Sequence, residues 1–390
     1  MNSRKRLLIF TTGRGGGHRS SSNAIEQAIR ELDPDVKIIS FDAMRLMPGY
    51  RGDDNDESGY IELTTKYKMV WKSLFEVSSR FPKGSNRVLM STIYPRFRRL
   101  VLTVKPDAIL SLHPCFVGSV IECLQRMNLS IPVCAGIIDL VKHSRLWHDS
   151  RCARTFVPTD TMSRELSKEG FQPSTVIHSG FPIGNQFVVT ERKEQGSGDK
   201  KRVLMVNPSL GSDEETLALI DAALKHDVEL TVITGSDRGL KSFLDQHMND
   251  RQAVEVLGYI HDMEQRLAKA DVVITKAGPN MVLEAVRMCV PVLITGHILG
   301  QEEENYKYVV DNGYGLKCES PQELEDALGR LFENDCELLK AMSRNEQNCH
   351  DTQGAAVIAK SVLEILNESD YPRQMDSPRK MAAATQAGVR

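Results

Sequence analysis

Short apolar runs alternate with amphipathic segments along almost the whole chain. The apolar runs are rich in Val, Ile and Leu, as strands buried on both faces of a parallel sheet are. They lie at 6–10, 36–42, 108–113, 133–139, 154–159, 175–180, 202–209, 230–236, 253–260, 271–278, 290–296 and 313–319. Helical spacing fills the gaps at 22–32, 60–79, 86–104, 117–127, 161–169, 213–225, 237–248, 261–270, 280–288, 301–312 and 321–333. This alternation predicts an α/β protein with two Rossmann-like, doubly wound halves.

The two halves are separated by a charged segment that carries glycine and serine, 189–202, which is typical of a linker. We therefore expect a first domain over 1–188 and a second over 203–368. The last segment, 369–390, lacks hydrophobic periodicity and is predicted to be a disordered tail. No apolar run reaches the length of about 18 residues that a membrane-spanning helix needs.

Charge is distributed unevenly. The net charge of −3 offers no general attraction for nucleic acid, so no nucleic-acid partner is expected. The segment 80–105 holds seven basic residues and no acidic one, with apolar residues between them. Such a segment is typical either of binding to an anionic membrane surface or of a solvated helix with one face on the core. The eight cysteines show no metal-binding spacing, which favours reduced thiols. We expect a cytoplasmic protein peripherally associated with a membrane.

A glycine-rich turn, "GRGGGH" at 13–18, follows the first predicted strand. Open α/β sheets bind ligands at this end of a strand, and glycines let the backbone approach a ligand closely. We expect Gly16 and Gly17 on the side of an acceptor. His18 is the candidate general base, since its ordinary pKa suits proton transfer near neutral pH. Asp139, at the end of another strand, is the alternative base. The third alternative is that both residues only position the acceptor. Three residues of the following loop are also expected on the acceptor side, with the aromatic ring packing against a sugar or an acyl chain: His143, Trp147 and His148.

The second half carries a sharper pattern at 271–302. A strand ends in a turn at Gly278 and Pro279, and a helix begins near Asn280. The first amides and the dipole of such a helix favour a diphosphate without a metal, and no DxD pair at a strand end suggests one. Glu284, one turn later, suits a ribose diol. Two further polar side chains at the next helix start suit sugar hydroxyls: Gln301 and Glu302. Together these features predict a nucleotide-sugar site.

The motifs "KAGPNMVLEA", "GQEEENY" and "YVVDNGYG", with "GGGHRSSSNAI" and "IDLVKHSRLWHD" before them, resemble one family in order and spacing. It is the family 28 type of glycosyltransferases, which includes plant monogalactosyldiacylglycerol synthase and bacterial processive diacylglycerol glucosyltransferase. The resemblance spans about residues 7–365. It implies a GT-B fold, in which two Rossmann-like domains face a central cleft. It further implies inverting transfer of a hexose from a UDP-sugar, without a cofactor, to a lipid acceptor such as diacylglycerol.

The resemblance also assigns roles to individual positions. Ile260 would contact the uracil through its backbone, and the turn at Gly278 would hold the diphosphate. Ser209 and Gly211 match a loop that is usually richer in glycine. The positions assigned to the nucleotide sugar are Ser209, Gly211, Gly235, Ile260, Ala277, Gly278, Pro279, Asn280, Glu284, Gln301 and Glu302.

Three other functions remain open at this point. The first is a UDP-sugar glycosyltransferase that acts on a non-lipid acceptor. A UDP-sugar 2-epimerase shares the two-domain architecture and needs no acceptor. A nicotinamide-dependent oxidoreductase is disfavoured, because His18 replaces the third glycine of the GxGxxG pattern.

Overall fold

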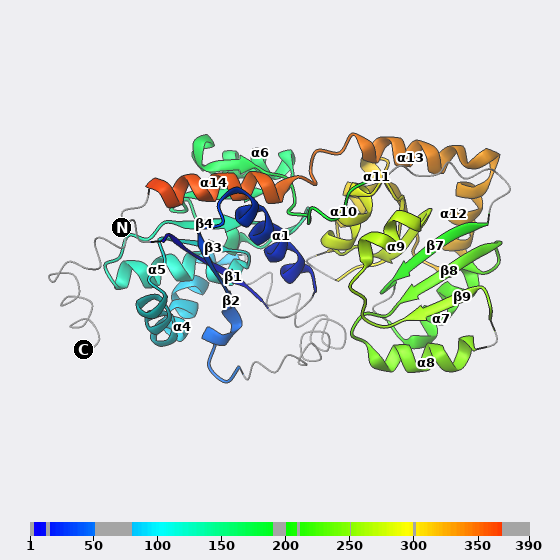
Figure 1. The fold of residues 1–390 in the computed structure, drawn as a ribbon, viewed down its shortest axis with the longest axis horizontal. Coiled ribbons are helices and arrows are strands. Elements are labelled where there is room, and N and C mark those ends of the chain that lie inside the picture. Colours follow the sequence, from blue (N-terminus) through cyan, green and yellow to red (C-terminus); the bar gives the residue numbers. More distant parts are fainter. Residues whose placement is uncertain are drawn as a thin grey trace.

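The computed structural model describes residues 4–12, 16–50, 80–189, 200–208, 211–249, 251–298 and 302–368. They form two lobes, each built on a six-stranded parallel sheet with helices on its faces (Figure 1). The first sheet has the order β2-β1-β3-β4-β5-β6. Its strands are β1 (Arg6–Thr11), β2 (Lys37–Asp42), β3 (Ala108–Ser111), β4 (Val133–Gly136), β5 (Arg154–Val157) and β6 (Val176–His178). The predicted α/β architecture with a doubly wound first half is confirmed.

The second sheet has the order β12-β11-β10-β7-β8-β9. Its strands are β7 (Lys201–Val206), β8 (Val228–Ile233), β9 (Val254–Leu257), β10 (Val272–Lys276), β11 (Val292–Gly296) and β12 (Gly315–Lys317). In each sheet the direction in which successive strands are added reverses once. The reversal lies between β1 and β3 in the first sheet and between β7 and β10 in the second. Ligands of open α/β sheets bind at such switch points, beyond the carboxyl ends of the strands.

The helices of the first lobe are α1 (Gly16–Leu32), α4 (Pro82–Val104), α5 (Gly118–Arg126) and α6 (Asp160–Lys168). Those that follow β7 are α7 (Asp213–Ala223), α8 (Arg238–Met248), α9 (Met263–Lys269), α10 (Pro279–Arg287), α11 (Asn305–Asp311), α12 (Pro321–Phe332), α13 (Glu337–Gln347) and α14 (Gly354–Glu368). The first helix starts six residues earlier than the sequence indicated, at Gly16 instead of 22. Its serines are therefore interior residues and not N-caps, and Ser21 and Ser22 are buried.

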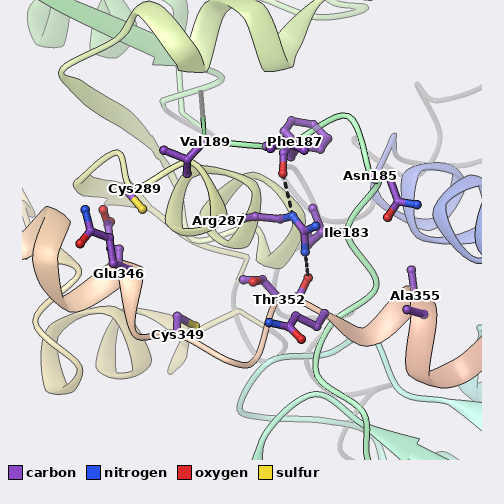
Figure 2. Close-up of a pocket in the computed structure, with 14 residues that line it drawn as sticks. Ile183, Asn185, Phe187, Val189, Arg287, Cys289, Glu346, Cys349, Thr352 and Ala355 are labelled. Atoms are coloured by element: carbon purple, nitrogen blue, oxygen red, sulfur yellow. Dashed lines mark hydrogen bonds between the residues drawn. The ribbon is translucent and has the colours of Figure 1, made fainter. Parts of the chain in front are cut away.

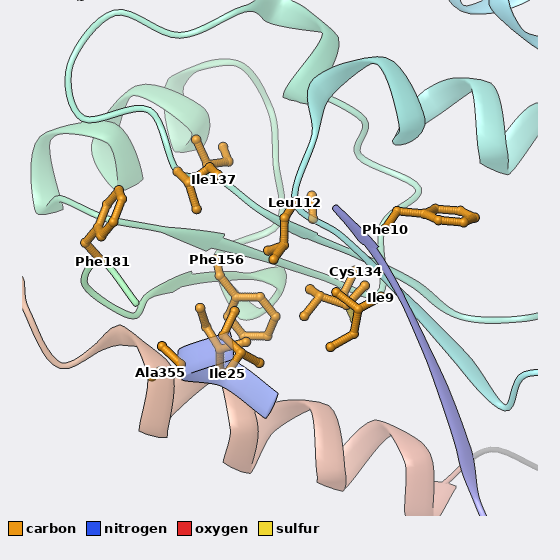
Figure 3. Close-up of a cluster of buried hydrophobic side chains, with 14 of the residues drawn as sticks. Ile9, Phe10, Ile25, Leu112, Cys134, Ile137, Phe156, Phe181 and Ala355 are labelled. Atoms are coloured by element: carbon orange, nitrogen blue, oxygen red, sulfur yellow. The ribbon is translucent and has the colours of Figure 1, made fainter. Parts of the chain in front are cut away.

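The last helix, α14, lies within the range assigned to the second half but packs against α1 on the first lobe (Figure 1). Figure 3 shows Ala355 of α14 and Ile25 of α1 in one cluster with Ile9 and Phe156 of the sheet. Burying an apolar side chain of the size of Ile or Phe stabilises a fold by about 1.5–3 kcal/mol. This apolar contact explains why the chain returns to the first lobe. The predicted helix 60–79, the linker residues 190–199 and the tail 369–390 lie outside the described residues.

The chain thus passes between the lobes twice, and the side chain of Arg287 forms hydrogen bonds with both connecting segments. The Arg287 guanidinium donates from Nε to the Phe187 carbonyl at 2.7 Å and from Nη1 to the Thr352 carbonyl at 2.6 Å (Figure 2). A cavity of about 550 Å³ lies beside it, lined by residues of both connecting segments. Arg287 is the last residue of α10, so this helix joins the connecting segments to the switch point at its other end.

Candidate active site

His18 lies in the first turn of α1, directly beyond β1 at the first switch point. Its Nδ1 lies 3.0 Å from the Leu112 carbonyl oxygen. A carbonyl only accepts, so Nδ1 carries the proton and Nε2 keeps a lone pair. Burial lowers the pKa of His18 below its ordinary value, while the nearby Asp139 and the bond to Leu112 oppose this. The ring is therefore neutral at neutral pH and able to accept a proton at Nε2.

The two candidate bases of the first half belong to one buried cluster. Asp139, 7% exposed, accepts a hydrogen bond of 2.7 Å from the indole N–H of Trp147. Trp147 is completely buried. In this structure the ring packs inside the protein and positions Asp139, and its predicted contact with a sugar or an acyl chain stays a prediction. The missed member of the cluster is His113, whose ring centroid lies 5.6 Å from that of His18. Burial lowers the pKa of His113 to about 3, so it too is neutral.

The two other predicted acceptor-side histidines contact each other. Nε2 of His143 lies 2.7 Å from Nε2 of His148, and Nδ1 of His148 lies 2.5 Å from a Glu169 carboxylate oxygen. Nδ1 of His143 lies 3.1 Å from the Val141 carbonyl. Three hydrogen bonds therefore connect the two rings to each other, to the Val141 carbonyl and to Glu169. Burial and the neighbouring His143 lower the pKa of His148.

The second switch point holds an ion pair that the sequence did not reveal. Nζ of Lys276, at the end of β10, lies 3.0 and 3.3 Å from the two carboxylate oxygens of Glu302. The backbone N–H of Ile298 donates to the same carboxylate at 2.9 Å. A Cβ placed on Gly278 would lie 3.6 Å from that ammonium. The predicted diphosphate turn and the predicted sugar-reading residue therefore meet at Lys276.

The two switch points touch each other through α1 and α10. The Ser20 hydroxyl donates to Glu284 at 3.0 Å, and the Asn280 amide donates to the Ser21 hydroxyl at 3.2 Å. A Cβ on Gly17 would come within 2.5 Å of the Asn280 side-chain oxygen, so a larger residue here would require Asn280 to move. The space beside Gly17, which we expected to admit an acceptor, is filled by Asn280. The backbone of Gly16 opens the same helix.

Glu284 is the strongly perturbed acid of this contact. It is 8% exposed, and burial raises its pKa to about 7. The Ser20 hydrogen bond opposes this rise and the charge of Glu264 adds to it. A second bridge between the lobes joins Lys142, in the loop after Asp139, to Glu303, with Nζ 3.4 Å from the carboxylate.

The remaining predicted nucleotide-sugar positions lie along the same edge of the second sheet. Gly235, with a φ of +60°, follows β8 and its Cβ position lies 3.4 Å from the Asn207 side chain beyond β7. Ile260 is half-buried beyond β9, and Ala277 and Pro279 flank Gly278. Gly211 is exposed just before α7. Two positions lie outside the described residues: Ser209 and Gln301.

Within the described ranges, no three His, Cys, Asp or Glu side chains come together as a metal site. In that same part of the chain, no helix is both long and apolar enough to cross a bilayer.

Solved structures of the same architecture support the class. UGT71G1 of Medicago truncatula, solved in complex with UDP-glucose, superposes with a TM-score of 0.61 at 13% identity, covering 94% of this chain and 99% of that one. A putative UDP-N-acetylglucosamine 2-epimerase of Listeria monocytogenes gives 0.62 at 15% identity, covering 95% and 98%. Likeness at this identity establishes the fold alone. With two doubly wound sheets meeting at their switch points, that fold is GT-B, as predicted.

Sequence comparison separates the transferases from the epimerases. The model of the glycosyltransferase family 28 C-terminal domain matches residues 203–377, and that of monogalactosyldiacylglycerol (MGDG) synthase matches 18–183. The monogalactosyldiacylglycerol synthase 3, chloroplastic, of Arabidopsis thaliana is 27% identical over 94% of this chain and 84% of its own length. The first half of the chain therefore matches an MGDG synthase domain and the second half a family 28 glycosyltransferase domain, and the predicted glycosyltransferase is confirmed.

Proposed function

We propose that the chain transfers a hexose from a UDP-sugar to a lipid acceptor such as diacylglycerol at a membrane surface, with inversion at the anomeric carbon. The observation that carries this proposal is the match to monogalactosyldiacylglycerol synthase across both lobes. The UDP donor is supported by the switch point at the start of α10, whose amides and dipole suit a diphosphate without a metal.

In this proposal His18 is the general base. Its Nδ1–H is held by the Leu112 carbonyl, which points the free Nε2 lone pair away from that carbonyl. The acceptor oxygen forms a bond to the anomeric carbon while its proton passes to Nε2. The bond from that carbon to the diphosphate oxygen breaks, and the electron pair leaves with UDP. Asp139, held by Trp147, stabilises the imidazolium that forms.

The membrane contact is supported by the first two turns of α4. Phe81, the N-cap residue, and Val88, in the second turn, are 62% and 69% exposed. The basic side chains of this stretch, Arg80, Lys83 and Arg87, are also exposed. Large exposed apolar side chains next to cationic ones are typical of a surface that binds anionic lipid.

A vesicle flotation assay tests the membrane contact. We expect the protein to float with vesicles that contain phosphatidylserine, and Phe81→Ser with Val88→Ser to abolish this. Leu32→Ser, which removes an exposed apolar side chain elsewhere (56% exposed), is the matched control. Absence of flotation by the unaltered protein would instead favour the non-lipid acceptor.

A donor screen tests the reaction itself. Purified protein is incubated with UDP-glucose or UDP-galactose and dispersed diacylglycerol, and products are read by mass spectrometry. A glycosylated lipid is expected, with or without EDTA. Conversion of a UDP-sugar in the absence of any acceptor would favour the epimerase, and no product with diacylglycerol would overturn the lipid proposal.

A further inference from the structure

The ion pair between Lys276 and Glu302 is almost enclosed by protein. The side chain of Glu302 is 8% exposed and that of Lys276 is 24% exposed. Both oxygens of the carboxylate lie within reach of the single ammonium, and one of them also accepts from Ile298. A pair so placed is costly to break by removing one partner, because the other charge is left buried.

The ion pair lies beside Gly278, where the predicted contacts to the donor diphosphate and to the donor sugar meet. Without a side chain, this glycine leaves a space whose Cβ position is 3.6 Å from the ammonium and 3.7 Å from Glu302 Oε1. A diphosphate at the turn from β10 to α10 would enter this space. There it would lie about equally close to the ammonium and to the Glu302 carboxylate, which it attracts and repels respectively.

The proposed function places conflicting demands on Glu302. Reading a sugar hydroxyl requires carboxylate oxygens that are free to accept hydrogen bonds. Here Lys276 holds both of them. A diphosphate carries at least two negative charges and competes with the carboxylate for the same ammonium.

We propose that the donor diphosphate takes Lys276 from Glu302, and that Glu302 becomes available to the donor sugar only as a result. This inference rests on the proposed function. Lys276 then contacts the leaving group directly. When the bond between the anomeric carbon and the diphosphate breaks, its electron pair passes to the phosphate oxygen, and the ammonium stabilises the added charge.

The exchange predicts opposite effects for its two partners. Lys276→Met should weaken binding of UDP by about tenfold or more, since charge-assisted bonds to phosphate are lost, and leave uridine unchanged. Glu302→Gln should strengthen binding of UDP, because the competitor for the ammonium is gone. It should also reduce the gain in affinity from UDP to UDP-glucose or UDP-galactose. Gln keeps an acceptor for the Ile298 N–H.

Isothermal titration of the full chain with uridine, UDP and the two UDP-sugars tests these signs. Lys276→Arg should retain most of the affinity for UDP. Lys307→Met is the matched control, since it removes an exposed lysine from an ion pair with Glu304 at the same helix start. Thermal unfolding reports whether each variant is folded.

The inference is overturned if Lys276→Met changes uridine and UDP binding equally, or if Glu302→Gln weakens UDP binding. A merely structural pair would give these results, since either substitution would then loosen the same loop. An unaltered protein that binds no UDP at all would overturn the proposed donor as well, so the two failures are distinguishable.

Discussion

The buried carboxyl of Glu284 predicts how donor binding depends on pH. Burial raises its pKa from the ordinary 4.5 to about 7. This difference corresponds to about 3 kcal/mol in favour of the protonated form. Between these two values the folded chain holds a proton that the unfolded chain has released. The stabilisation from protonated Glu284 is therefore complete below about pH 4.5 and is lost as the pH rises through about 7.

Binding of a ribose diol has the opposite preference, because the carboxylate and not the acid accepts two hydrogen bonds. We expect the affinity for uridine or UDP to rise between about pH 6 and pH 8, with release of up to one proton per ligand. Ser20→Ala removes the hydrogen bond that opposes the raised pKa. It should therefore move the midpoint of this rise to a higher pH.

Titration calorimetry at pH 6.5 in buffers of different ionisation enthalpy measures the released protons. Glu284→Gln should release none and should bind with no dependence on pH in this range. Burial lowers the pKa of His18 from its ordinary value, and the Glu284→Gln variant, which keeps His18, separates the two groups. An affinity that is flat from pH 6 to pH 8 in the unaltered protein would refute the assignment of Glu284 to the ribose.

Three other predictions follow from the contacts of the first lobe. His18→Ala should bind UDP as before but lose transfer by about 10²- to 10⁴-fold, and full activity would contradict its role as base. Trp147→Phe removes the donor to buried Asp139 and should lower the free energy of unfolding by about 1–3 kcal/mol in urea titrations. This loss should vanish when Asp139→Leu, which removes the acceptor, is already present. Lys142→Glu should lower turnover about two- to fivefold, and adding Glu303→Lys should restore it. A double variant that is no more active than Lys142→Glu would show that the ion pair between the lobes does not matter for turnover.

Hydrophobic periodicity predicted the strands well because parallel strands are buried on both faces. The runs at 108–113 and 133–139, for example, became β3 and β4, although each strand is shorter than its apolar run. The helices α13 and α14 were not predicted. Gly354 opens α14, and the burial pattern of this helix reflects contact with α1, which lies far away in the sequence.

The candidate site could be predicted only where its residues are close together in the sequence. The turn at Gly278 and the acid at Glu284 follow from a strand, a glycine and a helix in succession. His113 and Lys276 were missed, although each stands at the end of a predicted strand. The information missing from the sequence is the strand order. Because β3 lies beside β1, the end of β3 lies next to His18.

No pattern in the sequence predicted the contacts between the lobes. Serines at the start of a helix are typical of caps, yet Ser20 and Ser21 bond to Glu284 and Asn280 of the other lobe. Two of the predicted donor residues thus already have partners from the acceptor half. A ribose hydroxyl that bonds to Glu284 must either displace Ser20 or share the carboxylate with it. In the proposed function the first lobe therefore takes part in donor recognition through Ser20.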